Sequence, residues 1–93
     1  MIKTFSDKRT AALFMGIPAK GIPADVRKRA REKLVVLNQA KGIEDLRAPP
    51  SNHLEALRGD RVGQHSIRVN LQWRICFVWQ DGDVYEVEFA DYH

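Results

Sequence analysis

The sequence predicts an α+β fold in which an N-terminal strand and two helices pack on one face of a twisted antiparallel sheet, with the other face open. Three observations lead to this prediction. Apolar residues recur at helical spacing over residues 24–41, the pattern changes to alternation after residue 54, and Pro49 with Pro50 separates the two regions. A chain of 93 residues is too short for two independent cores, so residues 1–93 are predicted to form one domain.

The first half is expected to hold a short strand at residues 2–5 and two helices. Ser6 is a favourable N-cap for the first helix, which Gly16 should end. The second helix, residues 24–41 with Gly42 closing it, has the strongest helical pattern in the chain. Its apolar stripe consists of Val26, Ala30, Leu34 and Leu37.

The second half is expected to hold four strands, because apolar and polar residues alternate there. The predicted strands are 54–57, 64–69, 73–79 and 83–90. Three-residue loops at 70–72 and 80–82 would place only apolar and aromatic residues on one face of the sheet. That face comprises Ile67, Val69, Trp73, Ile75, Phe77, Trp79, Tyr85, Val87 and Phe89.

On the opposite face, the same register places Arg68 directly opposite Arg74, and Glu88 opposite Arg74 on its other side. Two adjacent arginines repel each other unless an anion bridges them. Glu88 is one such anion, and a phosphate is the other, because the guanidinium fork matches phosphate oxygens. The arginine pair is therefore a candidate site for phosphate.

Charge is distributed unevenly along the chain. Residues 1–80 hold all 15 Lys and Arg residues with 7 acids, a net charge of +8, whereas residues 81–93 hold 5 acids and no base. A basic body is compatible with a polyanionic partner. On the second helix, Arg27, Lys28 and Arg31 are candidate RNA-binding residues, and an ordinary solvated face is the alternative interpretation.

Composition and motifs exclude several other functions. With Cys76 as the single cysteine, no internal disulfide forms, and the three histidines lack metal-ligand spacing, so no metal site is expected. Phosphate-loop and dinucleotide-binding motifs are absent, and no cofactor is expected. No apolar run approaches a membrane span or a signal peptide, so we expect a cytoplasmic protein with no membrane partner.

The end of the chain supplies residue types suited to RNA cleavage without a metal. That reaction requires deprotonation of the 2′-hydroxyl, stabilisation of phosphate charge and protonation of the leaving oxygen. Arginine serves the second requirement, and histidine, tyrosine or a carboxylate serves the others. The candidate catalytic residues are Arg74, Asp91, Tyr92 and His93. His53, in the loop before the first predicted strand of the sheet, is a candidate RNA-binding residue, and an ordinary loop histidine is the alternative interpretation.

Six segments carry a family resemblance: Met1-Ile2-Lys3-Thr4-Phe5, Asp45-Leu46 to Pro49-Pro50, Leu54-Glu55-Ala56-Leu57-Arg58-Gly59-Asp60-Arg61, Ser66-Ile67-Arg68-Val69-Asn70, Gln72-Trp73-Arg74-Ile75-Cys76-Phe77 and Asp91-Tyr92-His93. Together they resemble HigB-type toxins of the RelE/ParE superfamily of type II toxin–antitoxin systems. The resemblance implies a RelE-like fold and a ribosome-dependent mRNA endonuclease that cuts codons in the A site of the 70S ribosome. It also implies a HigA-type helix-turn-helix antitoxin and a toxin–antitoxin complex that binds its own operator DNA.

By position, the resemblance assigns roles to individual residues. Arg74 matches the family's strand arginine at the scissile phosphate, and Asp91-Tyr92-His93 matches the catalytic C-terminal tripeptide. Arg58 matches a basic position in the active-site rim, and Arg68 matches a basic strand position of the wider superfamily. A gyrase-inhibiting toxin like ParE shares the fold and is the alternative function. A toxin that has lost its activity and serves only as a corepressor is a further one.

The general base stays open. Some family members place a histidine where this sequence has Glu55, and His53 lies two residues earlier. His53, Glu55 and His93 are therefore all candidates for the group that deprotonates the 2′-hydroxyl.

Overall fold

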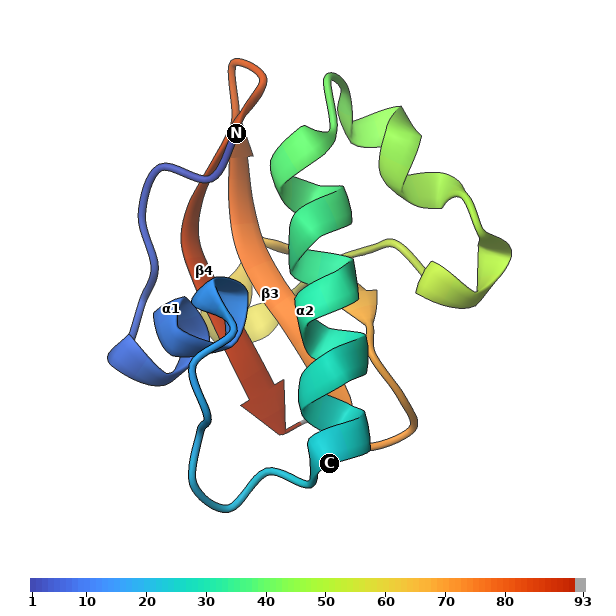
Figure 1. Ribbon diagram of the computed structural model, residues 1–93. Helices are drawn as coiled ribbons and strands as arrows, with labels where there is room; N and C mark the ends of the chain where they lie inside the picture. The colour runs from blue at the N-terminus through green and yellow to red at the C-terminus, as the bar shows by residue number, and fades with distance from the viewer. Residues whose placement is uncertain (92–93) are drawn as a thin grey trace.

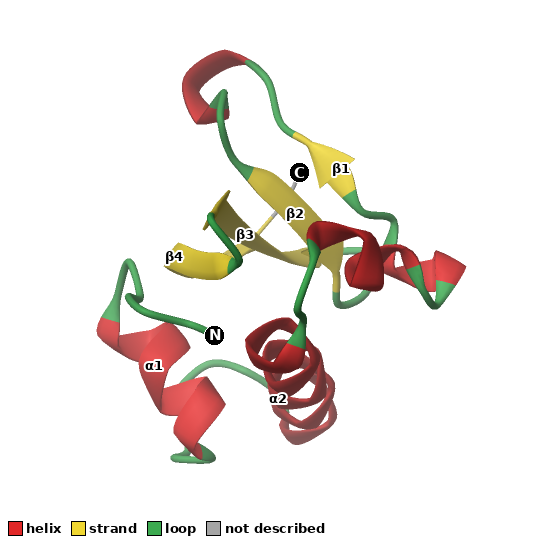
Figure 2. Ribbon diagram, turned by 90° about the horizontal axis from the view of Figure 1, so that it is seen from above, coloured by secondary structure: helices red, strands yellow, loops and turns green. Residues whose placement is uncertain are grey.

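The computed structural model describes residues 1–91 and has the predicted α+β architecture (Figure 1). Helices α1 (Lys8–Met15) and α2 (Ala24–Gln39) lie on the same side of a four-stranded antiparallel sheet, as the view from above shows (Figure 2). The sheet has the strand order β1-β2-β3-β4. Its strands are β1 (Glu55–Ala56), β2 (His65–Arg68), β3 (Trp73–Gln80) and β4 (Asp83–Asp91). Three short 3₁₀ helices are η1 (Ile43–Arg47), η2 (Pro50–Asn52) and η3 (Gly59–Arg61).

The core lies between the two helices and the sheet. The predicted stripe of α2 is buried at all four positions, Val26, Ala30, Leu34 and Leu37. These residues pack against the strand residues Ile67, Ile75, Phe77 and Phe89, all with no exposed surface. Burying each large apolar side chain stabilises the fold by about 1.5–3 kcal/mol, so this layer supplies most of the driving force. Within residues 1–91, no helix combines the length and apolar character needed to cross a bilayer.

The ends of both helices differ in detail from the prediction. Asp7, and not Ser6, caps α1, because its carboxylate accepts a hydrogen bond from the Thr10 amide at 2.7 Å. Gly16 ends α1 as predicted, with a left-handed φ of 79°. The prediction that Gly42 closes α2 was wrong: the helix ends at Gln39, and Gly42 instead precedes η1.

The N-terminal segment, predicted as a short strand at residues 2–5, runs beside β4 without forming a continuous strand. It forms two isolated parallel bridges, Ile2 with Val84 and Phe5 with Val87. The amide of Ile2 also donates to the side chain of Asn38 on α2 at 2.8 Å. These contacts fix the start of the chain between β4 and the helical layer.

The register of β2 on β3 is the predicted one, with Ile67 opposite Ile75 and Arg68 opposite Arg74. The predicted three-residue loop between β3 and β4 was wrong. The strands are joined by a two-residue turn, Asp81-Gly82, with φ of 52° and 82°. Two left-handed residues give the turn whose twist matches that of the flanking strands.

A β-bulge in β4 corrects the side-chain alternation after this turn. Between the pairs Val78–Tyr85 and Cys76–Glu88 the register shifts by one residue, and Glu86 has a φ of 53°. The extra residue returns the following part of β4 to the predicted faces. Near the turn the predicted faces were wrong, because Val84 is fully buried in the core. Glu88 lies opposite Cys76 and not opposite Arg74, as had been predicted.

Candidate functional site

Arg74 lies on the face of the sheet away from the helices, since its neighbour Ile75 is buried in the main core. Only 6% of its surface is exposed. Its Nε donates to Ser66 Oγ at 2.8 Å, and its Nη2 donates to the backbone oxygen of His53 at 2.7 Å. The same Nη2 lies 3.7 Å from the half-exposed carboxylate of Glu55. A buried guanidinium thus joins β3 to β2, to β1 and to the segment before β1.

The backbone of His53 is held partly by Arg74. Its φ of 45° is left-handed, a conformation that costs a residue with a β-carbon about 1–2 kcal/mol. The hydrogen bond from Arg74 to the His53 oxygen helps to hold the strained turn. The sequence predicted His53 as a site residue through its imidazole, but the atom that contacts Arg74 is its backbone oxygen.

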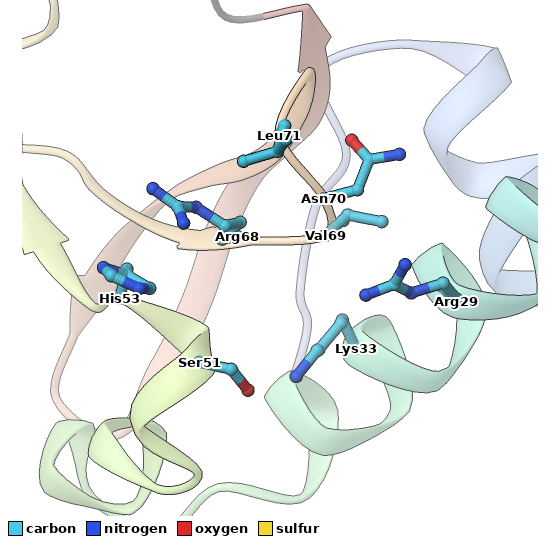
Figure 3. Close-up of a pocket in the computed structure, with 8 residues that line it drawn as sticks. All are labelled: Arg29, Lys33, Ser51, His53, Arg68, Val69, Asn70 and Leu71. Carbon is cyan, nitrogen blue, oxygen red and sulfur yellow. The ribbon is translucent and has the colours of Figure 1, made fainter.

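A cleft opens between α2 and the edge of β2, where β1 ends its pairing with β2 (Figure 3). This α2–β2 cleft has a volume of about 240 Å³. Arg29 and Lys33 line it from α2, His53 with Ser51 from η2 and the turn after it, and Arg68 from β2. Residues 69–71, which follow β2, complete the lining. The structure therefore brings together two predicted residues, His53 and Arg68.

Lys33 is held at the cleft by a buried amide. Its Nζ donates to Oδ1 of Asn52, which has no exposed surface. The Nδ2 group of Asn52 in turn donates to the backbone oxygens of Leu46 at 3.2 Å and Ala48 at 3.1 Å. Burial, and secondly the charge of Arg29, lower the pKa of Lys33 from its usual 10.5.

The last described residue, Asp91, lies at the end of the sheet where the cleft opens. It pairs with Trp73, the first residue of β3, and its Oδ2 accepts a hydrogen bond from Gln72 Nε2 at 3.2 Å. Gln72 follows directly on the loop that lines the cleft. Tyr92 and His93, the other members of the predicted catalytic tripeptide, lie outside the described residues.

The remaining predicted RNA-binding residues lie elsewhere. Arg27, Lys28 and Arg31 line a second groove of about 240 Å³ on the opposite edge of α2, the α1–α2 groove, whose other walls are largely apolar. Arg27 also donates through Nη1 to the backbone oxygen of Ile22 at 2.6 Å. Arg58 is exposed in the connection between β1 and β2 and does not line the α2–β2 cleft.

Comparison with known proteins supplies the family. A model of the RelE-like toxin HigB of type II toxin–antitoxin systems matches residues 3–93. The chain belongs to this HigB family. The curated protein Endoribonuclease HigB of Proteus vulgaris is 37% identical over 93 residues, which is the full length of both chains. Toxin HigB-1 of Vibrio cholerae is 44% identical over 61 residues, 66% of this chain and 64% of that protein.

Solved structures agree with the fold of this HigB-family chain. Two structures of the YoeB–YefM complex from Staphylococcus aureus, one described as a heterotetrameric toxin–antitoxin complex, each contain a similar chain. The TM-score is 0.63 at 14% identity, covering 100% of this chain and 98% of that one. The RelE-like architecture predicted from the sequence is therefore confirmed.

Two groups beside Arg74 complete the local electrostatics of the HigB-family chain. Arg61 Nη1 forms an ion pair with Glu88 Oε1 at 3.0 Å. Glu88 therefore does not bridge Arg68 and Arg74, as the sequence had suggested. Cys76 is buried with Leu57 and Ala90 on the face that bears Arg74. Burial raises the pKa of its thiol, which keeps it protonated at neutral pH.

Sequence reasoning missed Arg29 and Lys33. They are like charges four residues apart, on the edge of α2 opposite to the one formed by Arg27 and Arg31. Their i, i+4 spacing was a visible signal, but it did not distinguish the two edges of the helix. The contact of Lys33 with Asn52 makes that distinction, and it depends on tertiary structure.

Proposed function

We propose that this chain is a ribosome-dependent mRNA endonuclease, the toxin of a type II toxin–antitoxin pair. Membership of the HigB family supports the toxin class, and the name of the Proteus vulgaris relative supports cleavage of RNA. One observation carries the proposal. A cationic cleft and a buried arginine lie at the end of the sheet where the candidate catalytic tripeptide begins.

The reaction is attack of a 2′-hydroxyl on the adjacent phosphate, without a metal. Arg74, with Arg58 at the rim, neutralises the charge that develops on the phosphate. His93 acts as acid or base, and Asp91 and Tyr92 orient it or the nucleotide. Because Arg74 holds the backbone of His53 and lies 3.7 Å from Glu55, it also positions both other candidates for the general base.

The ribosome supplies the substrate in an ordered form. The candidate groups are a few side chains around an open cleft, so a codon held in fixed geometry in the A site would react faster than free RNA. Arg27, Lys28 and Arg31 bind ribosomal RNA, where phosphate contacts dominate affinity. This assignment predicts slow cleavage of naked RNA and fast cleavage of the same message on 70S ribosomes, measured with the purified toxin.

A neighbouring antitoxin neutralises the toxin. The structural neighbours are toxin–antitoxin complexes, and this supports an antitoxin partner. We propose a HigA-type helix-turn-helix protein, which with the toxin binds its operator DNA. The toxin acts in the cytoplasm, where ribosomes and operator are found.

Growth arrest and message cleavage test the proposal. Wild-type toxin and a variant lacking His93 are expressed without antitoxin, beside Arg47→Ala, which alters only an exposed ion pair with Glu44. We expect wild type and Arg47→Ala to arrest growth and to cut translated messages, and the deletion variant to do neither. Equal cleavage by a folded deletion variant would refute the role of His93. Inhibition of gyrase with intact messages would replace the nuclease by the alternative function.

A further inference from the structure

The α2–β2 cleft contains three cations without an acidic partner. Within the described part of the chain, no Asp or Glu oxygen lies within 4.0 Å of the side-chain nitrogens of Arg29, Lys33 or Arg68. Two acids on this side of the sheet pair with other arginines, Glu88 with Arg61 and Glu55 with Arg74. Cations gathered in one cleft repel each other, so the arrangement favours a bound anion.

Hydrogen bonds in the wall of the cleft hold Lys33 in position and leave donors for a ligand. Asn52 is fully buried, and its amide donors are committed to two backbone oxygens, so its oxygen is directed at Lys33. The Lys33 ammonium has three donors and uses one on Asn52, which leaves two for a ligand. Arg29 and Arg68 line the same cleft from α2 and from β2. Ser51 adds a hydroxyl donor on the wall formed by η2.

The low pKa of Lys33 agrees with this arrangement. Burial and, secondly, the nearby charge of Arg29 lower the pKa, and the charge of Glu32 opposes this shift. A bound anion would offset both lowering effects, because it stabilises the charged ammonium. An anionic ligand in the cleft would therefore favour the charged form of Lys33.

We propose that Arg29, Lys33 and Arg68 form a subsite for a backbone phosphate of the RNA strand, distinct from the scissile phosphate at Arg74. The subsite rests on the proposed function and deepens it. Arg68 lies directly opposite Arg74 across β2 and β3, so it links the two phosphate positions. Arginine forks and a lysine match phosphate oxygens, and the polar lining at Ser51 and Asn70 suits a hydrated strand.

Salt-dependent binding of RNA by the full-length protein tests the subsite. The ligand is a short 2′-O-methyl RNA, which cannot be cleaved because its attacking hydroxyl is blocked. Arg29→Gln is the main variant, since Arg29 is exposed and lies on the helix surface. Lys20→Gln removes one positive charge from an exposed residue that lines neither cleft and has no proposed RNA contact, and it is the matched control. Circular dichroism checks that both variants are folded.

We expect Arg29→Gln to weaken binding and to reduce the slope of log affinity against log salt by about 0.7, the value for one contact with a single strand. The control should keep the wild-type slope. In cleavage on ribosomes, Arg29→Gln should raise KM and leave kcat unchanged, because the subsite acts in binding. Equal slopes for the variant and the control would overturn the subsite.

Three further results test the anion chemistry, the RNA subsite and the nuclease separately. Inorganic phosphate that displaces the RNA from wild type but not from Arg29→Gln would confirm the anion chemistry. Phosphate binding at Arg29 with no loss of RNA affinity in the variant would overturn an RNA subsite. If wild type cleaves no message while the difference in slope persists, the proposed nuclease fails and the subsite stands.

Discussion

Two basic clefts of similar volume flank α2, and they differ in the residues that form the wall opposite the helix. The α2–β2 cleft joins Arg29 and Lys33 to the sheet edge, and its walls include Ser51, His53 and Asn70. The α1–α2 groove joins Arg27, Lys28 and Arg31 to Leu13, Ile17 and Pro18 of the α1 region. The first cleft contains His53, whose backbone contacts the candidate catalytic residue Arg74, whereas the second contains only the predicted RNA-binding residues of α2. Positive charge on a helix therefore does not locate a site unless the opposite wall is considered.

The difference arises from buried polar groups. On the side of the α2–β2 cleft, Arg74 and Asn52 are buried and bonded to the backbone around η2, and this fixes the wall that carries His53. In the α1–α2 groove, by contrast, the lining cation Arg27 donates to the loop before its own helix, at the backbone oxygen of Ile22. The first cleft should therefore respond strongly to loss of a buried polar group, and the second should not.

The largest expected effect is that of Arg74→Ala. Removing the guanidinium leaves the oxygens of Ser66 and His53 without this donor and the nearby Glu55 without its cation. Each acceptor left unsatisfied costs about 1–3 kcal/mol, whereas the loss of the pair with half-exposed Glu55 adds little. Urea denaturation measures the change in the free energy of unfolding.

The matched control for Arg74→Ala is Arg68→Ala, directly opposite on β2. Arg68 is less buried, and we expect its loss to cost less than about 1 kcal/mol. A comparable loss in the two variants would show that Arg74 does not support the wall of the cleft.

A smaller effect is expected from Asn52→Ala. The change leaves the backbone oxygens of Leu46 and Ala48 without this donor and releases Lys33, at a cost of about 1–3 kcal/mol. The exposed neighbour Ser51 offers the control Ser51→Ala, for which a change near zero is expected. Thermal melts measure both. A neutral Asn52→Ala would mean that the wall is fixed by other contacts.

How far the sequence predicts the sheet depends on the strand pair. Between β2 and β3, alternation and a short loop sufficed, and the pair Arg68–Arg74 was predicted correctly. Between β3 and β4, an uninterrupted alternation was assumed. With uninterrupted alternation, a two-residue turn at Asp81-Gly82 would place Glu86 and Glu88 on the apolar face, and a bulge removes this conflict. The bulge depends on a left-handed conformation of Glu86, which the glutamate residue type does not predict.

The candidate site was harder to predict than the fold. Alternation placed Arg74 and Arg68 on one face. It could not show that Arg74 contacts the backbone of His53, because the two residues are 21 apart in the chain and His53 lies in an irregular turn. The same holds for Lys33 and Asn52, 19 residues apart. Long-range contacts through loops carry no periodic signal, and these contacts decide which cations share a cleft.

The smallest expected effect is a shift in the pH dependence of RNA binding. Because the pKa of Lys33 is lowered, its ammonium loses its proton before pH 10.5 as the pH rises, and one phosphate contact is lost with it. Binding of phosphate favours the charged form of Lys33. In alkaline solution, RNA binding is therefore accompanied by protonation of Lys33. Lys33→Arg keeps its charge throughout and should hold its affinity into more alkaline solution than wild type. Lys28→Arg, in the α1–α2 groove, should follow the wild-type curve. Fluorescence anisotropy with the uncleavable RNA at constant ionic strength measures all three curves. If Lys33→Arg and wild type lose affinity at the same pH, the ammonium of Lys33 does not contact the RNA strand. The α2–β2 cleft would then not differ from the α1–α2 groove in its use of a lysine charge.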